Sequence, residues 1–335
     1  MQGLRLHGAG DVRLEPLAEP VAGPGEELVA ITAVGLCGSD LHWYAEGSIG
    51  GFTMTRPFVL GHEMGGVIAS GPRAGTRVAI DPADPCERCE LCIAGHTNLC
   101  PSTRFCGTPT QDGALVQRMA WPSRLLVPVP DTMSDEEVPL LESLGIAIHG
   151  VNLGHVRPGM RAGVYGAGPI GLLLVALLRA RGVARIVVTE PLPHRRAAAL
   201  RLGADVAIDV DADGVGRAAA ADEPVDVAFE AAGETAAIET ACLAVRAGGR
   251  VVLVGIPHGD SYVLPAGPAR FKGLTFPVAR RMQAPHLQQA VNLVHAGVVD
   301  LRTLVTSVHP LAEGPAAFAA LARRDGLKVV IRPDR

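Results

Sequence analysis

The sequence predicts an α/β protein of two domains, in which a β-rich domain is followed by a doubly wound parallel sheet. The chain has 335 residues, and at roughly 150 residues per domain this length suggests two domains. The first part holds short strand-like runs, such as 27–32 and 77–80, that Gly and Pro interrupt. After the turn at 157–159, apolar strands alternate with helical segments.

The second part is interpreted as six strands joined by helices, the pattern typical of a doubly wound sheet. The expected strands are 162–165, 185–189, 205–208, 225–229, 250–254 and 274–278, and the expected helices include 169–181, 193–202 and 235–245. From residue 285 the sequence predicts a helix, a hydrophobic segment, another helix and a last strand near 328–331. This tail can belong to either domain.

Composition and charge exclude several classes of protein. Hydrophobic residues make up 48% of the chain and charged residues 19%, so a large core is expected and long disorder is not. The formal net charge of −4 gives no field that would attract DNA or an anionic membrane. Residues 1–10 do not resemble a signal peptide, and no apolar stretch reaches the roughly 18 residues of a membrane span. We therefore expect a cytoplasmic protein.

A glycine turn after the strand at 162–165 indicates a dinucleotide-binding site. Gly166 permits the tight turn, Gly168 lets the backbone approach a pyrophosphate, and Gly171 lets the next helix pack against the sheet. Pro169 and Ile170 begin this helix, whose N-terminus offers unpaired N–H groups and a positive dipole to phosphate. The motif alone is weak, since an ordinary tight turn can also carry it.

The cofactor is expected to be NAD. The next strand ends at Glu190, whose carboxylate can accept hydrogen bonds from a ribose diol and would repel a 2′-phosphate. Glu190 can also be an ordinary solvated charge, and Arg195 and Arg196 nearby would tolerate a phosphate, so NADP is the less favoured alternative. Val254 and Gly255, at the end of a later strand, are further predicted cofactor contacts.

Four of the seven cysteines form one compact motif, Cys86-x2-Cys89-x2-Cys92-x7-Cys100. In a cytosolic chain of this size, clustered cysteines are more often metal ligands or reactive thiols than disulfides. Four thiolates form a closed tetrahedral shell around Zn²⁺, so this site is predicted to be structural. Four free surface cysteines, or a redox pair that would not need the other two, are the alternatives.

Two further segments offer ligands for a second, catalytic zinc. Cys37 lies in segment 35–42, and His62 and Glu63 lie in segment 60–66. A catalytic zinc has three protein ligands and one open position, and the third ligand here is Glu63 or Glu142. Taken singly, Cys37 can be a small buried residue and His62 a core histidine.

Together these motifs resemble the zinc-dependent medium-chain dehydrogenase/reductase family over essentially the whole chain. Segments 37–40 and 61–63, the four-cysteine loop and the turn at 166–171 occur in the family's order and spacing. Within the family the chain is most similar to the sorbitol, xylitol and L-idonate dehydrogenases. The similarity is carried by segments 37–44, 46–50, 104–109, 112–113 and 141–144.

The resemblance implies a GroES-like catalytic domain, 1–149 joined by 281–335, with a Rossmann NAD-binding domain, 150–280, inserted between its parts. It implies a catalytic zinc on Cys37, His62 and Glu63 with water as fourth ligand, and Glu142 touching that water or replacing Glu63. The resemblance implies that the active site lies in the cleft between these two domains. With the structural site, two zinc ions per chain are expected, as is a homodimer or homotetramer.

The implied reaction oxidises a secondary hydroxyl of a polyol or sugar acid to a ketone. Zinc would acidify the hydroxyl, and hydride would pass to the nicotinamide. Ser39 would accept the alcohol proton and His42 would relay it to solvent through the cofactor ribose. Without the family, Ser39 can be a helix cap and His42 a surface histidine.

The substrate pocket is expected to be polar. Its candidate contacts are Tyr44, Glu142 and either Arg280 or Arg281, because the local spacing leaves the arginine ambiguous. An arginine would also bind a sugar carboxylate in a bidentate manner. Cys106 either lines this pocket or is a buried structural thiol.

The chain departs from these relatives at Ser143, where they usually have Pro, and at Trp43, where they often have Tyr. Other functions also remain open. A zinc enzyme of the same family could act on threonine or a simple alcohol, and a zinc-free quinone reductase of the same fold would lack the cysteine loop. A non-catalytic zinc- and nucleotide-binding module is the alternative from another class. The set Cys37, His62 and Glu63 argues against that module.

Overall fold

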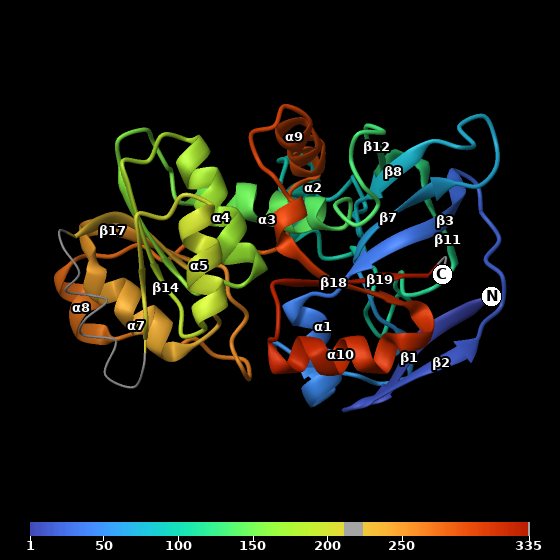
Figure 1. Ribbon diagram of the computed structural model, residues 1–335, viewed down its shortest axis with the longest axis horizontal. Coiled ribbons are helices and arrows are strands. Elements are labelled where there is room, and N and C mark those ends of the chain that lie inside the picture. The colour runs from blue at the N-terminus through green and yellow to red at the C-terminus, as the bar shows by residue number, and fades with distance from the viewer. Residues whose placement is uncertain (211–223, 334–335) are drawn as a thin grey trace. The chain divides into compact units, whose positions relative to one another are not determined.

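The computed structural model describes residues 1–210 and 224–333, which form two compact units (Figure 1). One unit joins Met1–Gly145 to Gln283–Arg335, and the other is Ile146–Met282. Helix α3 (Leu140–Leu153) carries the chain from the first unit into the second. The divisions therefore fall at 145/146 and 282/283, where the sequence analysis places them at 149/150 and 280/281.

A seven-stranded sheet forms the centre of the first unit. Its order is β12-β8-β7-β3-β19-β18, with β11 also paired to β3. These strands are β3 (Glu26–Gly35), β7 (Glu63–Ile68), β8 (Arg77–Ile80), β11 (Arg118–Pro122), β12 (Leu126–Pro128), β18 (Val305–Pro310) and β19 (Lys328–Arg332). The returning tail thus places β19 beside β3, with Val330 opposite Gly35.

Smaller elements surround this sheet. A three-stranded sheet has the order β2-β1-β6, and two short hairpin-like pairs are β4 with β5 and β9 with β10. The strands are β1 (Gln2–Gly8), β2 (Asp11–Pro16), β4 (Ser48–Ile49), β5 (Phe52–Thr53), β6 (Phe58–Val59), β9 (Ala83–Asp84) and β10 (Arg104–Phe105). The helices are α1 (Gly38–Glu46), α2 (Glu90–Ile93), α9 (Ala284–His295) and α10 (Gly314–Arg323), with 3-10 turns at Thr97–Leu99, Ser123–Leu125, Arg302–Leu304 and Leu311–Glu313.

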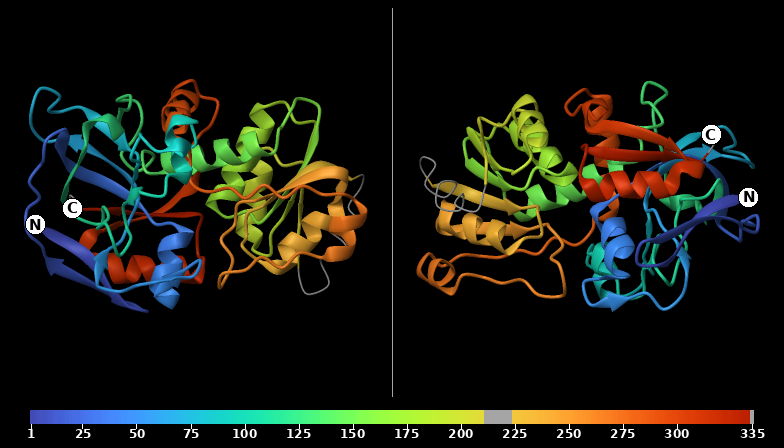
Figure 2. Two further views of the ribbon diagram at one scale, coloured as in Figure 1. Left: turned by 180° about the vertical axis from the view of Figure 1, so that it is seen from behind. Right: turned by 60° about the horizontal axis from the view of Figure 1, so that its bottom comes forward.

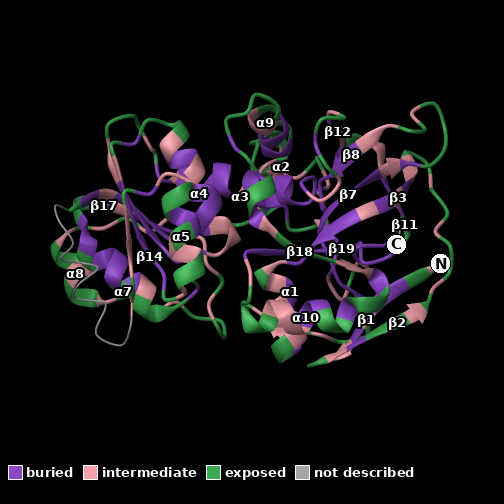
Figure 3. Ribbon diagram, viewed as in Figure 1, coloured by how far each residue is buried: buried purple, intermediate pink, exposed green. Residues whose placement is uncertain are grey.

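The second unit is a five-stranded parallel sheet of order β15-β14-β13-β16-β17 with helices between the strands (Figure 2). Its strands are β13 (Arg161–Tyr165), β14 (Arg185–Thr189), β15 (Val206–Ile208), β16 (Val225–Glu230) and β17 (Val245–Leu253). Its helices are α4 (Pro169–Ala180), α5 (Pro193–Arg201), α7 (Thr235–Ala244) and α8 (Ala266–Phe271). The order reverses beside β13, as in a doubly wound sheet. Residues of these central strands are largely buried (Figure 3).

The sixth predicted strand of this sheet forms only in part. Residues 274–278 lie parallel to β17, with bridges at Arg250–Thr275 and Leu253–Val278. Thr275 N donates to Gly249 O at 3.2 Å, and Val251 N donates to Thr275 O at 2.9 Å. Pro277 has no N–H to donate to a ladder, although its carbonyl accepts a bond from Leu253 N at 2.9 Å. The sequence analysis also missed helix α3, which contains Glu142 and Ser143. No helix in the described part of the chain is long and apolar enough to cross a membrane.

Candidate metal centres and cofactor site

Three predicted ligands meet in the first unit. The Sγ atom of Cys37 and one ligand atom each of His62 and Glu63 all lie within 4.8 Å of one another. Sheet pairing brings them together: β3 ends just before Cys37, β7 begins at Glu63, and Gly35 of β3 lies opposite Glu63. A soft thiolate, an imidazole and a carboxylate at this spacing suit a zinc ion.

Asp40, which the sequence analysis did not select, orients the histidine of this centre. Its side chain is fully buried, its oxygens accept hydrogen bonds from Cys37 N at 3.0 Å and Gly61 N at 3.3 Å, and Oδ1 lies 3.5 Å from His62 Nδ1. Burial by itself would raise the pKa of this carboxyl, but His62 and the two N–H groups hold the pKa below its usual range. Ser39 Oγ lies 3.2 Å from the other ring nitrogen, Nε2. A carboxylate behind the ring is the usual partner of a metal-binding histidine.

Glu63 is engaged through both of its carboxylate oxygens. Oε1 accepts a hydrogen bond from Ser143 Oγ at 2.8 Å, and Oε2 forms a buried ion pair with Lys328 Nζ. Glycine at position 35 makes room for this pair, because a Cβ there would lie 2.5 Å from Glu63 Oε2 and 3.0 Å from Lys328 Cε. Although burial opposes the charge on Lys328, Glu63 and the thiol of Cys37 raise the pKa of its ammonium group.

Glu142, in the first turn of α3, is the second carboxylate at this centre. It is only 3% exposed, and its Oε2 has no hydrogen-bond partner among the described residues. Burial, with the nearby charge of Glu63, raises the pKa of Glu142 to about 8. A buried carboxylate oxygen without a partner is costly unless a cation or proton meets it, so Glu142 also fits a metal ligand.

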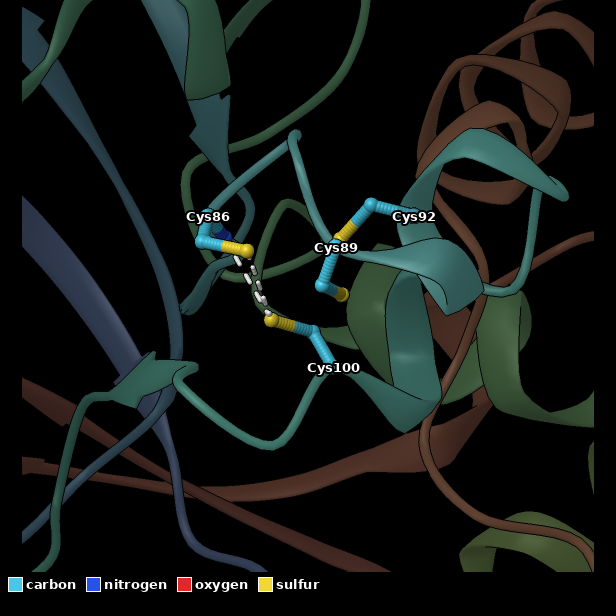
Figure 4. A group of neighbouring side chains, drawn as sticks. All are labelled: Cys86, Cys89, Cys92 and Cys100. Atoms are coloured by element: carbon cyan, nitrogen blue, oxygen red, sulfur yellow. Dashed lines mark hydrogen bonds between the residues drawn. The ribbon is translucent and has the colours of Figure 1, made fainter.

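The four cysteines of the loop also gather. The Sγ atoms of Cys86, Cys89, Cys92 and Cys100 all lie within 4.8 Å of one another (Figure 4). Cys86 N donates to Cys100 Sγ at 3.4 Å, and backbone N–H groups of this kind lower the pKa of Cys100 to about 6 against the opposing effect of burial. Thiols held with their sulfur atoms together are suited to a closed zinc shell.

The glycine turn has the geometry that the sequence predicts for it. Gly166 has φ 103°, and Gly168 is the N-cap of α4, with Pro169 in its first turn. A Cβ on Gly171 would lie 2.0 Å from Gly166 O, so only glycine allows the helix to approach the turn this closely. The N-terminus of α4 is therefore open to a phosphate.

Glu190 lies against this turn. Its Oε2 accepts a hydrogen bond from Ala167 N at 2.8 Å and its Oε1 one from Leu192 N at 3.1 Å. Arg196 donates to the carbonyl of Glu190 at 2.8 Å and lies 3.0 Å from Asp209 Oδ2. Glu190 is 4% exposed, so it is a structural part of the turn's surroundings and not an ordinary solvated charge.

Comparison with known proteins agrees with this geometry. Residues 23–131 match the family described as the alcohol dehydrogenase GroES-like domain, and residues 169–296 match the family described as zinc-binding dehydrogenase. Sorbitol dehydrogenase of Bacillus subtilis (strain 168) is 34% identical over 357 residues, which cover 100% of this chain and 98% of that protein. The chain belongs to the zinc-dependent medium-chain dehydrogenase family.

Other relatives of this dehydrogenase agree. Human sorbitol dehydrogenase is 33% identical, with 99% of this chain and 95% of the relative covered. The crystal structure of L-idonate 5-dehydrogenase from Escherichia coli has a TM-score of 0.89 and 29% identity, covering 99% of this chain and 97% of that one. A zinc-binding dehydrogenase from Sinorhizobium meliloti 1021 bound to NADP has a TM-score of 0.90 and 28% identity, with 99% of both chains covered. The predicted family and the GroES-like and Rossmann fold class are confirmed.

Three residues that the sequence analysis discusses near the substrate pocket pack as follows: Trp43, Tyr44 and Cys106. Trp43 is a core residue, 5% exposed and edge-on to Phe58 with ring centroids 5.3 Å apart. Tyr44 stacks near Phe318, with centroids 5.2 Å apart. Cys106 is fully buried, and burial raises the pKa of its thiol well above the usual range. Of the two alternatives for Cys106, this favours a buried structural thiol over a residue that lines the pocket.

The remaining candidates lie apart along the chain. His42 Nδ1 is 3.1 Å from Glu46 Oε1 on the same face of α1. Arg280 and Arg281 lie in the second unit, just before its end at Met282. Arg281 has φ 54°, a left-handed conformation that is uncommon for a residue with a side chain. Sequence reasoning gave no role to Asp40, Ser143 or Lys328. Asp40 carried a signal as the third residue of a helix that begins after a ligand, and Ser143 carried one as a departure from the relatives.

Proposed function

We propose that the chain is an NAD-dependent zinc dehydrogenase that oxidises a secondary hydroxyl of a polyol or sugar acid to a ketone. The observation that carries the proposal is the group of half-buried Cys37 with buried His62 and Glu63, and buried Glu142 near them. The names of its relatives support the substrate class: sorbitol dehydrogenases, a probable D-xylulose reductase A at 35% identity and an L-idonate 5-dehydrogenase.

Cys37 and His62 would hold a catalytic zinc together with Glu142 or Glu63. Zinc, when bound, supplies a Lewis acid for the alcohol, and NAD supplies the hydride acceptor. Glu142 is favoured as the third ligand, because its Oε2 is without a partner among the described residues while both oxygens of Glu63 are held by Ser143 and Lys328. Cys86, Cys89, Cys92 and Cys100 would hold a second, structural zinc.

The chain's own residues provide the proton path. Ser39 Oγ, which lies 3.2 Å from His62 Nε2, would accept the proton of an alcohol at this centre while its own hydroxyl proton passes on through the cofactor ribose towards His42. His42 would carry the proton onward, and Glu46 at its Nδ1 would hold the imidazole with Nε2 available. The role of Tyr44, Arg280 and Arg281 as polar contacts of the substrate also remains a proposal.

Each of the two units would have its own function. The first unit would be the catalytic zinc domain and the second the NAD domain, assembled as a homodimer or homotetramer. The carboxylate of Glu190 beside the glycine turn supports NAD over NADP, since it would repel a 2′-phosphate. We expect kcat/KM to be at least about tenfold higher with NAD than with NADP, a difference of roughly 1.4 kcal/mol in transition-state stabilisation.

Steady-state NADH production with sorbitol, xylitol, L-idonate, threonine and ethanol tests the function. We expect turnover of at least one polyol or sugar acid, and its loss in the double variant C37A/H62A. The matched control is Cys242→Ala, which removes a buried thiol of the second unit and should leave zinc content unchanged. Turnover of threonine or ethanol alone would replace the substrate class, and full activity of C37A/H62A would refute the mechanism.

A further inference from the structure

Glu230, the last residue of β16, joins two loops at the carboxyl edge of the parallel sheet. Its side chain is fully buried, and its Oε1 accepts hydrogen bonds from Ala232 N and Gly233 N, both at 2.7 Å. Its backbone carbonyl accepts bonds from Val254 N at 2.8 Å and Gly255 N at 3.0 Å. One residue thus connects the loop after β16 with the loop after β17.

Close packing shows that the two loops are fitted to each other. Gly233 has φ 75°, and a Cβ there would lie 2.1 Å from Ile256 O. A Cβ on Gly255 would lie 2.7 Å from Glu230 Oε2. Glycine is therefore needed in each loop, and the carboxyl of Glu230 occupies the space between them.

The same loop touches the glycine turn of the proposed cofactor site. Ala231 N donates to Tyr165 O at 2.8 Å, one residue before the turn. A Cβ on Gly166 would lie 2.9 Å from both the backbone N and the Cβ of Ala232. The position of Ala232, which Glu230 Oε1 fixes through a hydrogen bond, therefore limits where the first glycine of the turn can lie.

Burying the carboxyl group of Glu230 costs free energy of desolvation. Its Oε2 has no hydrogen-bond partner in the described part of the chain, and no cation is paired with it there. Burial raises the pKa of Glu230 above its usual range. An apolar side chain would fill the space without this desolvation, so the geometry points to a requirement for the acceptor itself.

We propose that Glu230 is a positioning residue for the dinucleotide, holding the loops 231–233 and 254–256 in the arrangement that lets the turn at 166–171 receive the pyrophosphate. The inference rests on the proposed function, because it takes that turn as the cofactor site. Glu230 itself is not placed in contact with the cofactor; it acts through Ala232 and Gly233.

The test measures the Kd for NADH by fluorescence titration of the zinc-loaded full chain. Glu230→Ala removes the acceptor, and Glu230→Asp shortens its reach by one methylene, so we expect both to weaken NADH binding about tenfold. Glu230→Gln keeps an oxygen at the Oε1 position and should stay within about twofold of wild type. If Glu230→Ala does not fold, the contrast between Asp and Gln decides.

Asp226→Asn is the matched control, because Asp226 is a structural carboxylate at the opposite end of the same strand, bonded to Arg161 N at 2.8 Å. We expect it to lower thermal stability while leaving the NADH Kd unchanged. Equal weakening by Asp226→Asn and Glu230→Asp would show a merely structural role and overturn the inference, as would wild-type binding in Glu230→Asp. Failure of the wild-type chain to bind NADH or NADPH would refute the proposed function instead.

Discussion

Lys328 balances the charge of Glu63 in the proposed zinc centre. The sequence has only two lysines, Lys272 and Lys328, and many arginines. Lys328 is 1% exposed, and its ammonium group forms an ion pair with Glu63. The compact ammonium group of a lysine fits the small space that Gly35 leaves beside Glu63. The guanidinium group of an arginine is planar and larger, and it needs several hydrogen-bond acceptors.

Removing this ammonium group should be strongly destabilising. Lys328→Met leaves the carboxylate of Glu63 buried and unpaired, and we expect the free energy of unfolding to fall by about 3 to 5 kcal/mol, measured by urea denaturation. The double variant K328M/E63Q removes both charges and should recover a large part of the loss. No recovery would mean that lost packing, and not the unpaired charge, causes the effect.

Asp40 would act on a bound metal through His62. Asp40→Asn keeps the volume but removes the charge behind the ring, so we expect zinc affinity at the catalytic site to fall about 10- to 100-fold. Competition with a chromogenic chelator measures this, and the second zinc per chain, on the four cysteines, serves as an internal reference. Equal loss of both zinc ions would indicate general unfolding of the first unit.

The identity of the third ligand can be decided in the same way. Glu142→Gln should lower occupancy of the catalytic zinc more than Glu63→Gln does, because the oxygens of Glu63 are already held by Ser143 and Lys328. Metal analysis after dialysis against a weak chelator gives the two occupancies. The reverse order would assign the position to Glu63.

At the scale of elements, the end of α7 depends on the other lysine. Lys272 Nζ donates to the carbonyls of Cys242, Leu243 and Val245, at 3.1, 2.5 and 2.8 Å, which are among the last carbonyls of the helix and the first of β17. Such carbonyls have no partner within a helix, and a cation there also meets the negative end of its dipole. We expect Lys272→Met to lower the thermal stability of the second unit, by an amount corresponding to about 1 to 2 kcal/mol.

Asp226, at the amino end of β16, should give the protein part of its stability against acid. Asp226 joins β16 to β13 through Arg161 N and to β17 through Arg246 Nε. Burial by itself would raise the pKa of Asp226, but these donors hold its pKa below the usual range of an aspartate. Because the folded-state pKa is the lower one, this stabilisation is present above the unfolded pKa and is lost as pH falls through the folded one. Asp226→Asn should flatten this acid limb in a Tm-against-pH series, and an unchanged limb would contradict the assignment.

At the scale of the whole molecule, the four-cysteine loop is expected to make zinc a part of the fold. Cys92→Ser should reduce zinc from two ions per chain to one and lower the Tm, since a three-thiolate shell holds zinc less tightly. Metal analysis and calorimetry measure both effects. The matched variant Cys106→Ser, which changes a buried thiol outside the loop, should leave both zinc ions in place.

The sequence by itself determined the features that depend on short spacing along the chain. The glycine turn, the four-cysteine loop and the order of strands and helices in the second unit each lie within one local segment, so local sterics and ligand chemistry were enough to predict them. The strand expected at 274–278 forms only in part, because Pro277 has no N–H to continue the ladder, a signal that the sequence itself carries.

Only the tertiary structure decided how the zinc centre is supported. Lys328 reaches Glu63 because β19 returns beside β3, and Ser143 reaches the same carboxylate from α3, a helix that the sequence analysis did not predict. Trp43, where the relatives often have Tyr, lies in the core because it packs against Phe58. These pairings join residues far apart in the chain, and burial and charge compensation, which select them, are properties of the folded interior and not of any local pattern.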